Sequence, residues 1–204
     1  ILSANSWMQT PQGYEINDVG IFFPTNWLEV IFNPSFPYRL LHMVVAAYLT
    51  TAFVVAGVAS YYFLKGVYKE HAKVMLGMAM IMAVFVAPLQ LFLGHSHGEN
   101  TMEHQPIKVA AMEGNWETGG NKPLYLLAHP DEEQEKTHSL LSIPNGASYV
   151  LTMKADGEVP GLKDVPKEDR PPVATVFWSF RVMVGIGMLM ILTGVMALLL
   201  YSRG

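Results

Sequence analysis

The stretch YRLLHMVVAAYLTTAFVVAGVASYYFL, Tyr38–Leu64, decides the fold. Its 27 residues include one charged residue, Arg39, and one histidine, His42. At 1.5 Å per residue, a helix of this length crosses the roughly 30 Å of hydrocarbon in a bilayer. The sequence therefore predicts a membrane-spanning helix over residues 38–64.

Similar apolar runs lie on both sides of this stretch. Val74–Leu93 predicts a second complete span, and Val173–Tyr201 predicts a third, which follows two prolines that suit a helix start. Residues 1–8 resemble the last turns of an earlier span. The fold class that we expect is all-α: a polytopic transmembrane helical bundle, with the end of one span, three complete spans and a long extracytoplasmic loop.

Composition agrees with a membrane protein. Hydrophobic residues make up 51% of the 204 residues, whereas charged residues make up 15%, below the roughly 25% of soluble domains. The absence of cysteine excludes disulfides and thiol catalysis. Because the chain begins at Ile1 and stops directly after an apolar run, we expect an internal piece of a longer membrane protein.

The short connections predict the orientation of the spans. Lys65, Lys69 and Lys73 crowd the turn between the first two spans, and Arg203 follows the third. The positive-inside rule places these residues in the cytoplasm, and the loop at 94–172 on the outer face. Residues 9–37 form an outer connector, in which Asn26 and Glu29 predict the capping box of a short surface helix.

The outer loop opens with GHSHGENTMEHQPIKVAAMEGNWET, Gly94–Thr118, the densest group of titratable residues in the chain. The whole loop carries seven Lys and Arg against thirteen Asp and Glu, so nucleic acid is not an expected partner. Pro106 and Gly114 predict the ends of a helix, and Asn145-Gly146 predicts a hairpin turn. The charged segments HPDEEQEKTHS and GEVPGLKDVPKEDRPP are expected to be mobile.

Three ionisable side chains lie within the predicted spans. Such residues are functional candidates, because an unpaired polar group in hydrocarbon is costly. His42 is a candidate haem-iron ligand, or else an interfacial histidine bonded to a carbonyl or water. Arg39 fits a haem propionate or a phospholipid headgroup. Arg181 needs an anionic partner, which a propionate or a carboxylate from another helix would supply.

Two groups in the outer loop are candidates for chemistry. Lys108 and Glu113 lie roughly 140° apart on a helix, so they either reach around a flat ligand or are two solvated surface charges. The second group has the spacing of metal ligands but also the composition of an ordinary solvated loop, and consists of His95, His97, Glu99, Glu103 and His104. The methionines of the third span are expected to fill gaps in packing.

Four stretches together resemble subunit I of the cytochrome bd-type quinol oxidases, which are bacterial terminal oxidases. They are ANSWMQTPQGYEI (Ala4–Ile16), NPSFPYRLLHMVVAAYLT (Asn33–Thr50), Gly94–Thr118 and FWSFRVMVGIGMLM (Phe177–Met190). The resemblance covers nearly the whole chain, but only the middle of the family's subunit. The short loop and its opening GHSHGENTMEHQP are similar to the short-loop, cyanide-insensitive branch.

The resemblance implies roles for individual residues. His42 matches the axial histidine of the low-spin haem b, and Lys108 and Glu113 match the lysine and glutamate used in quinol oxidation. Arg39 and Arg181 are candidate partners of a propionate or a polar site. The second ligand of this haem, a methionine, is expected beyond Gly204, and the histidine assigned to an oxygen-site haem is expected upstream of Ile1.

The family also implies cofactors, partners and a place in the cell. A second haem b and haem d are expected in the full subunit, with ubiquinol or menaquinol as substrate and O2 as electron acceptor. Subunit II, a small accessory subunit and membrane lipid are the expected partners in the bacterial cytoplasmic membrane. The activity implied is that of a quinol:oxygen oxidoreductase, with this fragment inactive alone. The alternative is a metal-binding transporter or sensor that uses His95, His97 and His104.

Overall fold

The computed structural model describes residues 1–203, and their side chains as far as Leu200. The chain forms two compact units. One is Ile1–His97 together with the part of α7 from Gly185 onward, and the other is Gly98–Val184. Helices α4 (Lys69–His104) and α7 (Val173–Arg203) contribute to both units. The sequence analysis placed Arg203 on the cytoplasmic side, and the side chain of Arg203 lies outside the residues whose side chains the structure describes.

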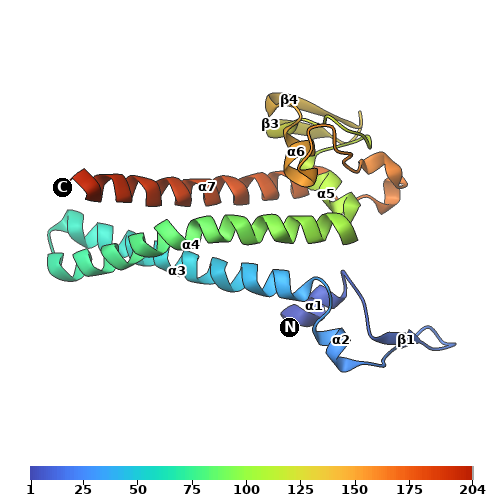
Figure 1. Cartoon of the computed structure of the whole chain (residues 1–204), viewed down its shortest axis with the longest axis horizontal. Helices are drawn as coiled ribbons and strands as arrows, with labels where there is room; N and C mark the ends of the chain where they lie inside the picture. Colours follow the sequence, from blue (N-terminus) through green and yellow to red (C-terminus); the bar gives the residue numbers. More distant parts are fainter. Residues whose placement is uncertain (204) are drawn as a thin grey trace. The chain divides into compact units, whose positions relative to one another are not determined.

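Three helices are long and apolar enough to cross a membrane: α3 (Phe36–Lys65), α4 and α7. The predicted fold class, a helical membrane protein, is confirmed in this respect. Helices α3 and α4 form an antiparallel pair joined by a tight turn (Figure 1). Gly66 ends α3 with a φ of +73°, a conformation that glycine adopts without the steric cost of a Cβ atom.

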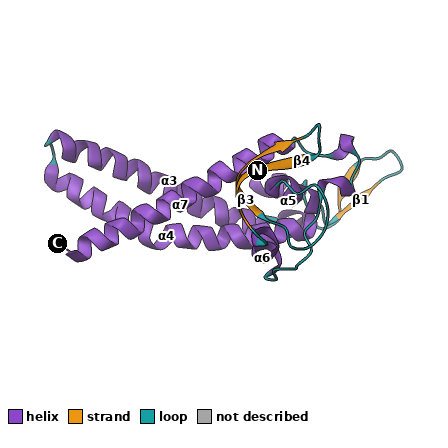
Figure 2. Cartoon of the chain, turned by 90° about the horizontal axis from the view of Figure 1, so that it is seen from above, coloured by secondary structure: helices purple, strands orange, loops and turns teal. Residues whose placement is uncertain are grey.

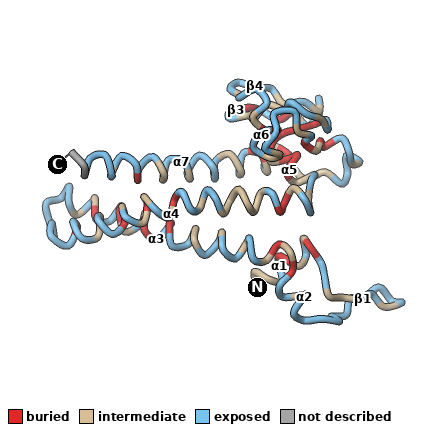
Figure 3. The backbone as a smooth tube through the Cα atoms, viewed as in Figure 1, coloured by how far each residue is buried: buried red, intermediate tan, exposed pale blue. Residues whose placement is uncertain are grey.

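The long helices of the first unit bury small side chains and expose large ones. All but one of the buried apolar residues of α3 and α4 are alanines; they are Leu49, Ala52, Ala56, Ala59, Ala72, Ala79, Ala83 and Ala87. Large apolar residues such as Val54, Met78 and Phe85 are exposed, and the long helices are mostly pale in Figure 3. Such a distribution suits helices that approach closely within a lipid solvent.

The contact between α4 and α7 gives a direct test of this packing. A Cβ atom at Gly194 would lie 3.0 Å from the carbonyl carbon of Ala83, whereas at Gly187 nothing lies within 4 Å. We expect Gly194→Val to destabilise the full-length protein by roughly 1–3 kcal/mol, because overpacking separates the helices. Thermal unfolding in detergent measures the change, with Gly187→Val as the matched control. Equal shifts for the two variants would show that the close contact contributes nothing.

Short elements connect the first residues to α3. Helix α1 (Leu2–Trp7) is followed by strands β1 (Tyr14–Ile16) and β2 (Phe22–Pro24) and by helix α2 (Trp27–Ile31). The expected cap of α2 is confirmed: the side chain of Asn26 accepts a hydrogen bond from Leu28 N and donates to Glu29 Oε1 at 2.8 Å. The side chain of Asn33, fully buried, donates to the carbonyls of Ser3 and Val30 and thereby joins α1 to α2.

The second unit contains a small helix and a hairpin. Helix α5 (Pro106–Glu113) has the predicted ends, with Gly114 as its C-cap. It is followed by β3 (Leu124–Asp131), β4 (Lys136–Ile143), α6 (Gly146–Thr152) and the 3-10 turns η1 (Leu162–Asp164) and η2 (Lys167–Asp169). The two antiparallel strand pairs, orange in Figure 2, were not predicted. The core of this unit consists of Ala110, Ala111, Trp116, Leu162 and Val173.

The structure of the loop differs from the sequence expectations in one turn, and it shows ordered elements in the two segments that were expected to be mobile. Asn145-Gly146 does not form a hairpin turn: Asn145, with a φ of +57°, precedes α6. The hairpin instead turns between Asp131 and Lys136, inside the segment expected to be mobile. The Pro- and Gly-rich segment that follows contains η1 and η2, and its Val159 and Leu162 are fully buried.

The sequence predicted that the second span ends at Leu93 and that a loop begins at Gly94. The apolar run does end there, but the helix does not. Helix α4 continues to His104. The titratable stretch therefore begins on a helix and not in a loop.

Candidate functional site

A buried ion pair joins the end of α5 to α7. Arg181 Nη2 lies 2.7 Å from Glu113 Oε2, and the two side chains are only 10% and 7% exposed. Arg181 Nε also donates to the backbone carbonyl of Tyr125 on β3. Its guanidinium lies 4.8 Å from the centre of the Phe177 ring, so it is held by a carboxylate, a carbonyl and an aromatic face together.

Local sequence explains why Glu113 takes this position. It is the last residue of α5, and Gly114 turns the chain away with a φ of +70°. Thr137 Oγ1 donates to the Gly114 carbonyl at 2.6 Å and accepts from Trp116 Nε1 at 3.0 Å. A Cβ atom at position 114 would lie 3.3 Å from the Phe177 ring. The turn after Glu113 is therefore fixed on both sides, and so is the carboxylate.

The backbone carbonyl that holds Arg181 belongs to a half-buried tyrosine. Burial raises the pKa of the Tyr125 hydroxyl above its ordinary value. Tyr125 is thus neutral at physiological pH, and it adds no charge beside the ion pair.

Lys108 is the other loop residue predicted to act on a ligand. Its Nζ donates to Gln105 Oε1 at 3.4 Å. The lysine is half-buried, whereas Glu113 is buried and turned toward Arg181. The structure thus brings together Glu113 and Arg181, a pairing that sequence spacing did not indicate.

His42 occupies a polar position within the first unit. Gln90 Nε2 from α4 lies 3.2 Å from His42 Nδ1, 3.1 Å from His42 Nε2, and 3.2 Å from the His42 carbonyl, to which it donates. The ring of His97 lies 5.8 Å away, between centroids. Gly94 leaves room for the ring, since a Cβ atom there would approach His42 Cε1 to 3.3 Å. His42 as a whole is partly buried.

Arg39 lies one helical turn before His42 on α3. Its Nη2 donates to Asn5 Oδ1 of α1. Its Nη1 is buried and has no hydrogen-bond partner. A buried guanidinium nitrogen without an acceptor is costly, so this atom fits an anionic group that the chain itself does not supply.

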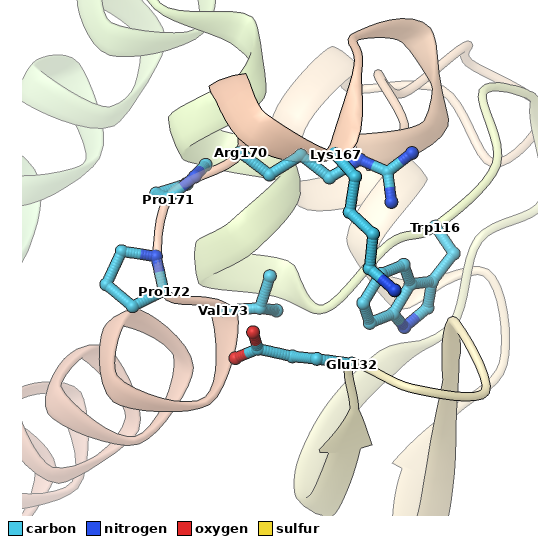
Figure 4. Close-up of a pocket in the computed structure, with 7 residues that line it drawn as sticks. All are labelled: Trp116, Glu132, Lys167, Arg170, Pro171, Pro172 and Val173. Carbon is cyan, nitrogen blue, oxygen red and sulfur yellow. The ribbon is translucent and has the colours of Figure 1, made fainter.

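Figure 4 shows a pocket of about 260 Å³ in the second unit. Its walls are the Trp116 ring, Lys167 and the segment from Arg170 to Val173, with Glu132 opposite. Arg170 Nη1 bonds Glu135 Oε1 at 2.7 Å, and this hydrogen bond lowers the pKa of the Glu135 carboxyl. Glu132 accepts a hydrogen bond from the backbone of Ala174 at 3.1 Å. The pocket is therefore a structural junction at the start of α7, and Glu113 does not line it.

The alternative of a metal site is not supported. Among the described residues, no group of three or more His, Asp or Glu side chains is placed to hold a metal ion. His95 and His97 lie on α4, where a separation of two residues turns their side chains roughly 200° apart. The expected site assumed a loop in which neighbouring histidines converge, and the helix prevents that.

Sequence reasoning missed two residues of these sites. Gln90 reads as an ordinary polar residue near the end of a span, although an amide in hydrocarbon is itself a signal that a partner exists. Asn115 follows Gly114 and is 4% exposed, and its Nδ2 has no hydrogen-bond partner. Its burial depends on contacts with residues far along the chain, so no local pattern indicates it.

Comparisons with known proteins agree with one another. A sequence model of the family described as cytochrome bd terminal oxidase subunit I matches residues 1–203. Cytochrome bd ubiquinol oxidase subunit 1 of Bacillus subtilis is 35% identical over the whole chain, which covers 45% of that protein. Cytochrome bd-II ubiquinol oxidase subunit 1 of Escherichia coli is 28% identical over the whole chain, which covers 53% of it.

A solved structure shares the fold. The bd oxidase from Geobacillus thermodenitrificans superposes with a TM-score of 0.85 at 31% identity, over 95% of this chain and 44% of that one. The chain thus spans about half the length of the curated relatives that it matches.

Proposed function

Because the chain belongs to the cytochrome bd terminal oxidase subunit I family, we propose that it is the middle part of a subunit that oxidises quinol and delivers the electrons to oxygen. The single observation that carries this proposal is the buried pair of Glu113 and Arg181 at the end of α5. A fixed carboxylate beside a cation suits the removal of protons from a quinol. The complete reaction converts quinol to quinone and O2 to water.

The loop unit supplies the quinol site in this proposal. A quinol loses two protons and two electrons when it becomes a quinone. Glu113 accepts a proton, Lys108 donates a hydrogen bond to a quinol oxygen, and Arg181 holds the Glu113 carboxylate in place. We assign Arg181 as the polar-site partner rather than as a propionate partner, since its Nε and Nη2 already donate to the Tyr125 carbonyl and to Glu113.

The first unit supplies part of a haem b site. When bound, haem b carries single electrons from the quinol site toward the oxygen-reducing haems. The residues present fit this group. His42 supplies an imidazole, and the unpartnered Arg39 Nη1 suits a propionate. The second axial ligand and the oxygen site belong to parts of the full subunit outside this chain.

The amide of Gln90 provides a further test of the fit. Its Oε1 is buried without a hydrogen-bond partner, while its Nε2 faces the His42 ring. Exchanging the amide oxygen and nitrogen would let Oε1 accept from one ring N–H of His42. The amide lies at nearly the same distance from the two ring nitrogens, so either of them can carry the bonded N–H while the other binds iron, and a bonded N–H is usual for iron- and zinc-bound histidines.

We expect Gln90→Leu to shift the midpoint potential and the absorption maximum of the low-spin haem b in the full-length oxidase. Loss of an acceptor for the His42 N–H changes both the orientation and the basicity of the ligand. Redox titration with optical detection measures the shift. Gln90→Glu retains an acceptor and should keep the ligand in place. If Gln90→Leu has the potential of the wild type, Gln90 does not orient His42.

The family suggests the membrane, the partner subunits and the substrate of this subunit. We propose that the subunit acts in a bacterial cytoplasmic membrane with subunit II and a small accessory subunit, and that residues 94–172 face outward, as the cluster of lysines at 65–73 predicts. The substrate is ubiquinol or menaquinol, and haem d with a second haem b completes the oxygen site.

We propose that the chain belongs to the short-loop branch of the family, with which the lengths of the alignments are consistent. The alignment with the Escherichia coli relative runs over 272 residues, and that with the Bacillus subtilis relative over 220, although each covers all of this chain. The Escherichia coli relative therefore has more additional residues within the aligned region than the Bacillus subtilis relative.

Oxygen uptake tests the function. The full-length subunit, expressed with its partner subunit in cells that lack other terminal oxidases, should give membranes that consume O2 when a quinol is added. Membranes from cells without the subunit are the control. Haem-loaded membranes that take up no oxygen with either ubiquinol or menaquinol would contradict the proposal.

A further inference from the structure

The half of the hairpin farther from its turn exposes large apolar side chains. The exposed side chains there are Leu126, Leu127, Leu140, Leu141 and Ile143, and we call this surface the apolar end of the hairpin. Leu140 is the most exposed, at 79%. Helix α6 follows directly and adds Tyr149, Val150 and Met153, which are also exposed. Monomeric soluble proteins rarely leave so many large apolar side chains in water together.

Two hydrogen bonds fix the direction of the hairpin along α7. At its turn, Glu132 Oε1 accepts from the backbone N–H of Ala174, in the first turn of α7. Near its open end, the Tyr125 carbonyl accepts from Arg181. Ala174 and Arg181 are seven residues apart, which corresponds to about 10 Å along the helix. The apolar end therefore lies farther along α7, and the turn lies beside the start of the helix.

The polarity of the hairpin changes in the same direction. The turn carries Asp131, Glu132, Glu133, Glu135 and Lys136, whereas the strand residues near Tyr125 are leucines and Ile143, apart from Ser142, which pairs with Tyr125. Charges thus gather beside the start of α7, and apolar side chains gather deeper along it.

The depth of this end can be compared with the bilayer. From Val182 to Tyr201 the sequence of α7 has no charged residue, and these 20 residues account for about 30 Å of helix, the thickness of the hydrocarbon layer. Arg181 therefore lies at the boundary between headgroups and acyl chains. Since Tyr125 is bonded to Arg181, the apolar end of the hairpin lies at that boundary too.

We propose that the apolar end of the hairpin, together with α6, is inserted into the lipid leaflet on the side of the loop. The occupant of this surface is bilayer lipid, because the surface continues at the depth where α7 enters the hydrocarbon. Neither the quinol reaction nor the haem site is needed for this insertion, so it stands or falls separately from the proposed function.

Spin labels placed at the two ends of the hairpin test the insertion. One label is attached through Leu141→Cys. Leu141 pairs with Leu127, which is two residues along β3 from Tyr125. The other label is attached through Glu133→Cys, in the turn of the hairpin. This part of the chain has no cysteine, so labels are specific once any cysteine elsewhere in the full-length subunit has been replaced. The oxidase is reconstituted in vesicles of phosphatidylcholine and phosphatidylglycerol. Collisions with O2, which concentrates in lipid, are then compared with collisions with a water-soluble nickel chelate.

The expected result is a reversal between the two positions. The label at position 141 should collide more often with O2 than with the nickel chelate, and the label at position 133 should do the opposite. If both labels are accessible to the nickel chelate, the hairpin lies in water and the proposal is wrong. If the label at position 141 is accessible to neither reagent, another protein segment covers the surface, and the proposal is equally wrong.

Discussion

His42→Ala in the full-length subunit is expected to remove the low-spin haem b band from the reduced-minus-oxidised spectrum, while the bands of the other haems remain. Alanine has no lone pair to bind iron, and Gln90, the nearest polar side chain, cannot replace an imidazole as axial ligand. The measurement is an optical spectrum of membranes that contain both subunits, with total haem determined by extraction. Loss of one of the two haems b should accompany loss of the band.

A second histidine provides the control. His71 is exposed near the start of α4, where its ring contacts Tyr68. His71→Ala removes the same side chain from the same unit, and the spectrum should keep all of its bands. If His42→Ala also retains the low-spin band, then His42 is an interfacial histidine held by Gln90, and the haem b site must lie elsewhere in the subunit.

The sequence predicted the long helices well because hydropathy acts over many residues. Twenty uncharged apolar residues in α7 leave no other stable arrangement than a span. Hydropathy did not predict where α4 ends. The polar residues after Gly94 still form a helix, since nothing in HSHGENTMEH interrupts backbone hydrogen bonding before Pro106.

The hairpin shows why turn signals can mislead. Asn-Gly favours a two-residue turn, but Asn145 adopts its left-handed conformation to start α6 instead. The actual turn forms at Asp131, whose carboxylate accepts hydrogen bonds from the backbone N–H groups of Glu133 and Gln134. The density of charges suggested mobility, but these side chains make defined contacts. Glu132 accepts a hydrogen bond from the backbone at the start of α7, and Glu135 pairs with Arg170.

The site could be predicted only residue by residue. His42, Lys108 and Glu113 were predicted as candidates from their surroundings in sequence and from the family resemblance, and their roles remain predictions. The partner of Arg181 could not be identified, because 68 residues separate it from Glu113 and no local period relates them. Only the fold of the loop unit brings these two charges to 2.7 Å.

That ion pair leads to the second large effect. We expect Glu113→Gln to lower the rate of quinol oxidation by about 10²–10⁴-fold, because the amide cannot accept a proton. Chemical reduction of the haems by dithionite should be unchanged, since it bypasses the quinol site. Glu117→Gln is the matched control: Glu117 lies four residues later, is exposed, and pairs with Lys163 at the surface. It should keep the wild-type rate.

Substitutions of Arg181 separate its positioning role from a merely structural one. Arg181→Gln leaves the buried Glu113 carboxylate without a cation, which should cost about 3–5 kcal/mol of stability. The double variant Glu113→Gln with Arg181→Gln contains no buried charge and should recover most of that stability, yet remain inactive with quinol. Arg181→Lys keeps the charge, but an ammonium group cannot reproduce the two fixed donors that hold Glu113 and the Tyr125 carbonyl.

The lysine variant therefore decides between the two roles. If Arg181 only stabilises the fold, Arg181→Lys should differ from the wild type in thermal stability alone, and a stable Arg181→Lys protein should oxidise quinol at the normal rate. If Arg181 positions Glu113, the lysine variant should fold, bind its haems and still oxidise quinol slowly, because the carboxylate is no longer held at one place. A normal quinol rate in Arg181→Lys would leave Glu113 as the only part of the pair that acts on the substrate.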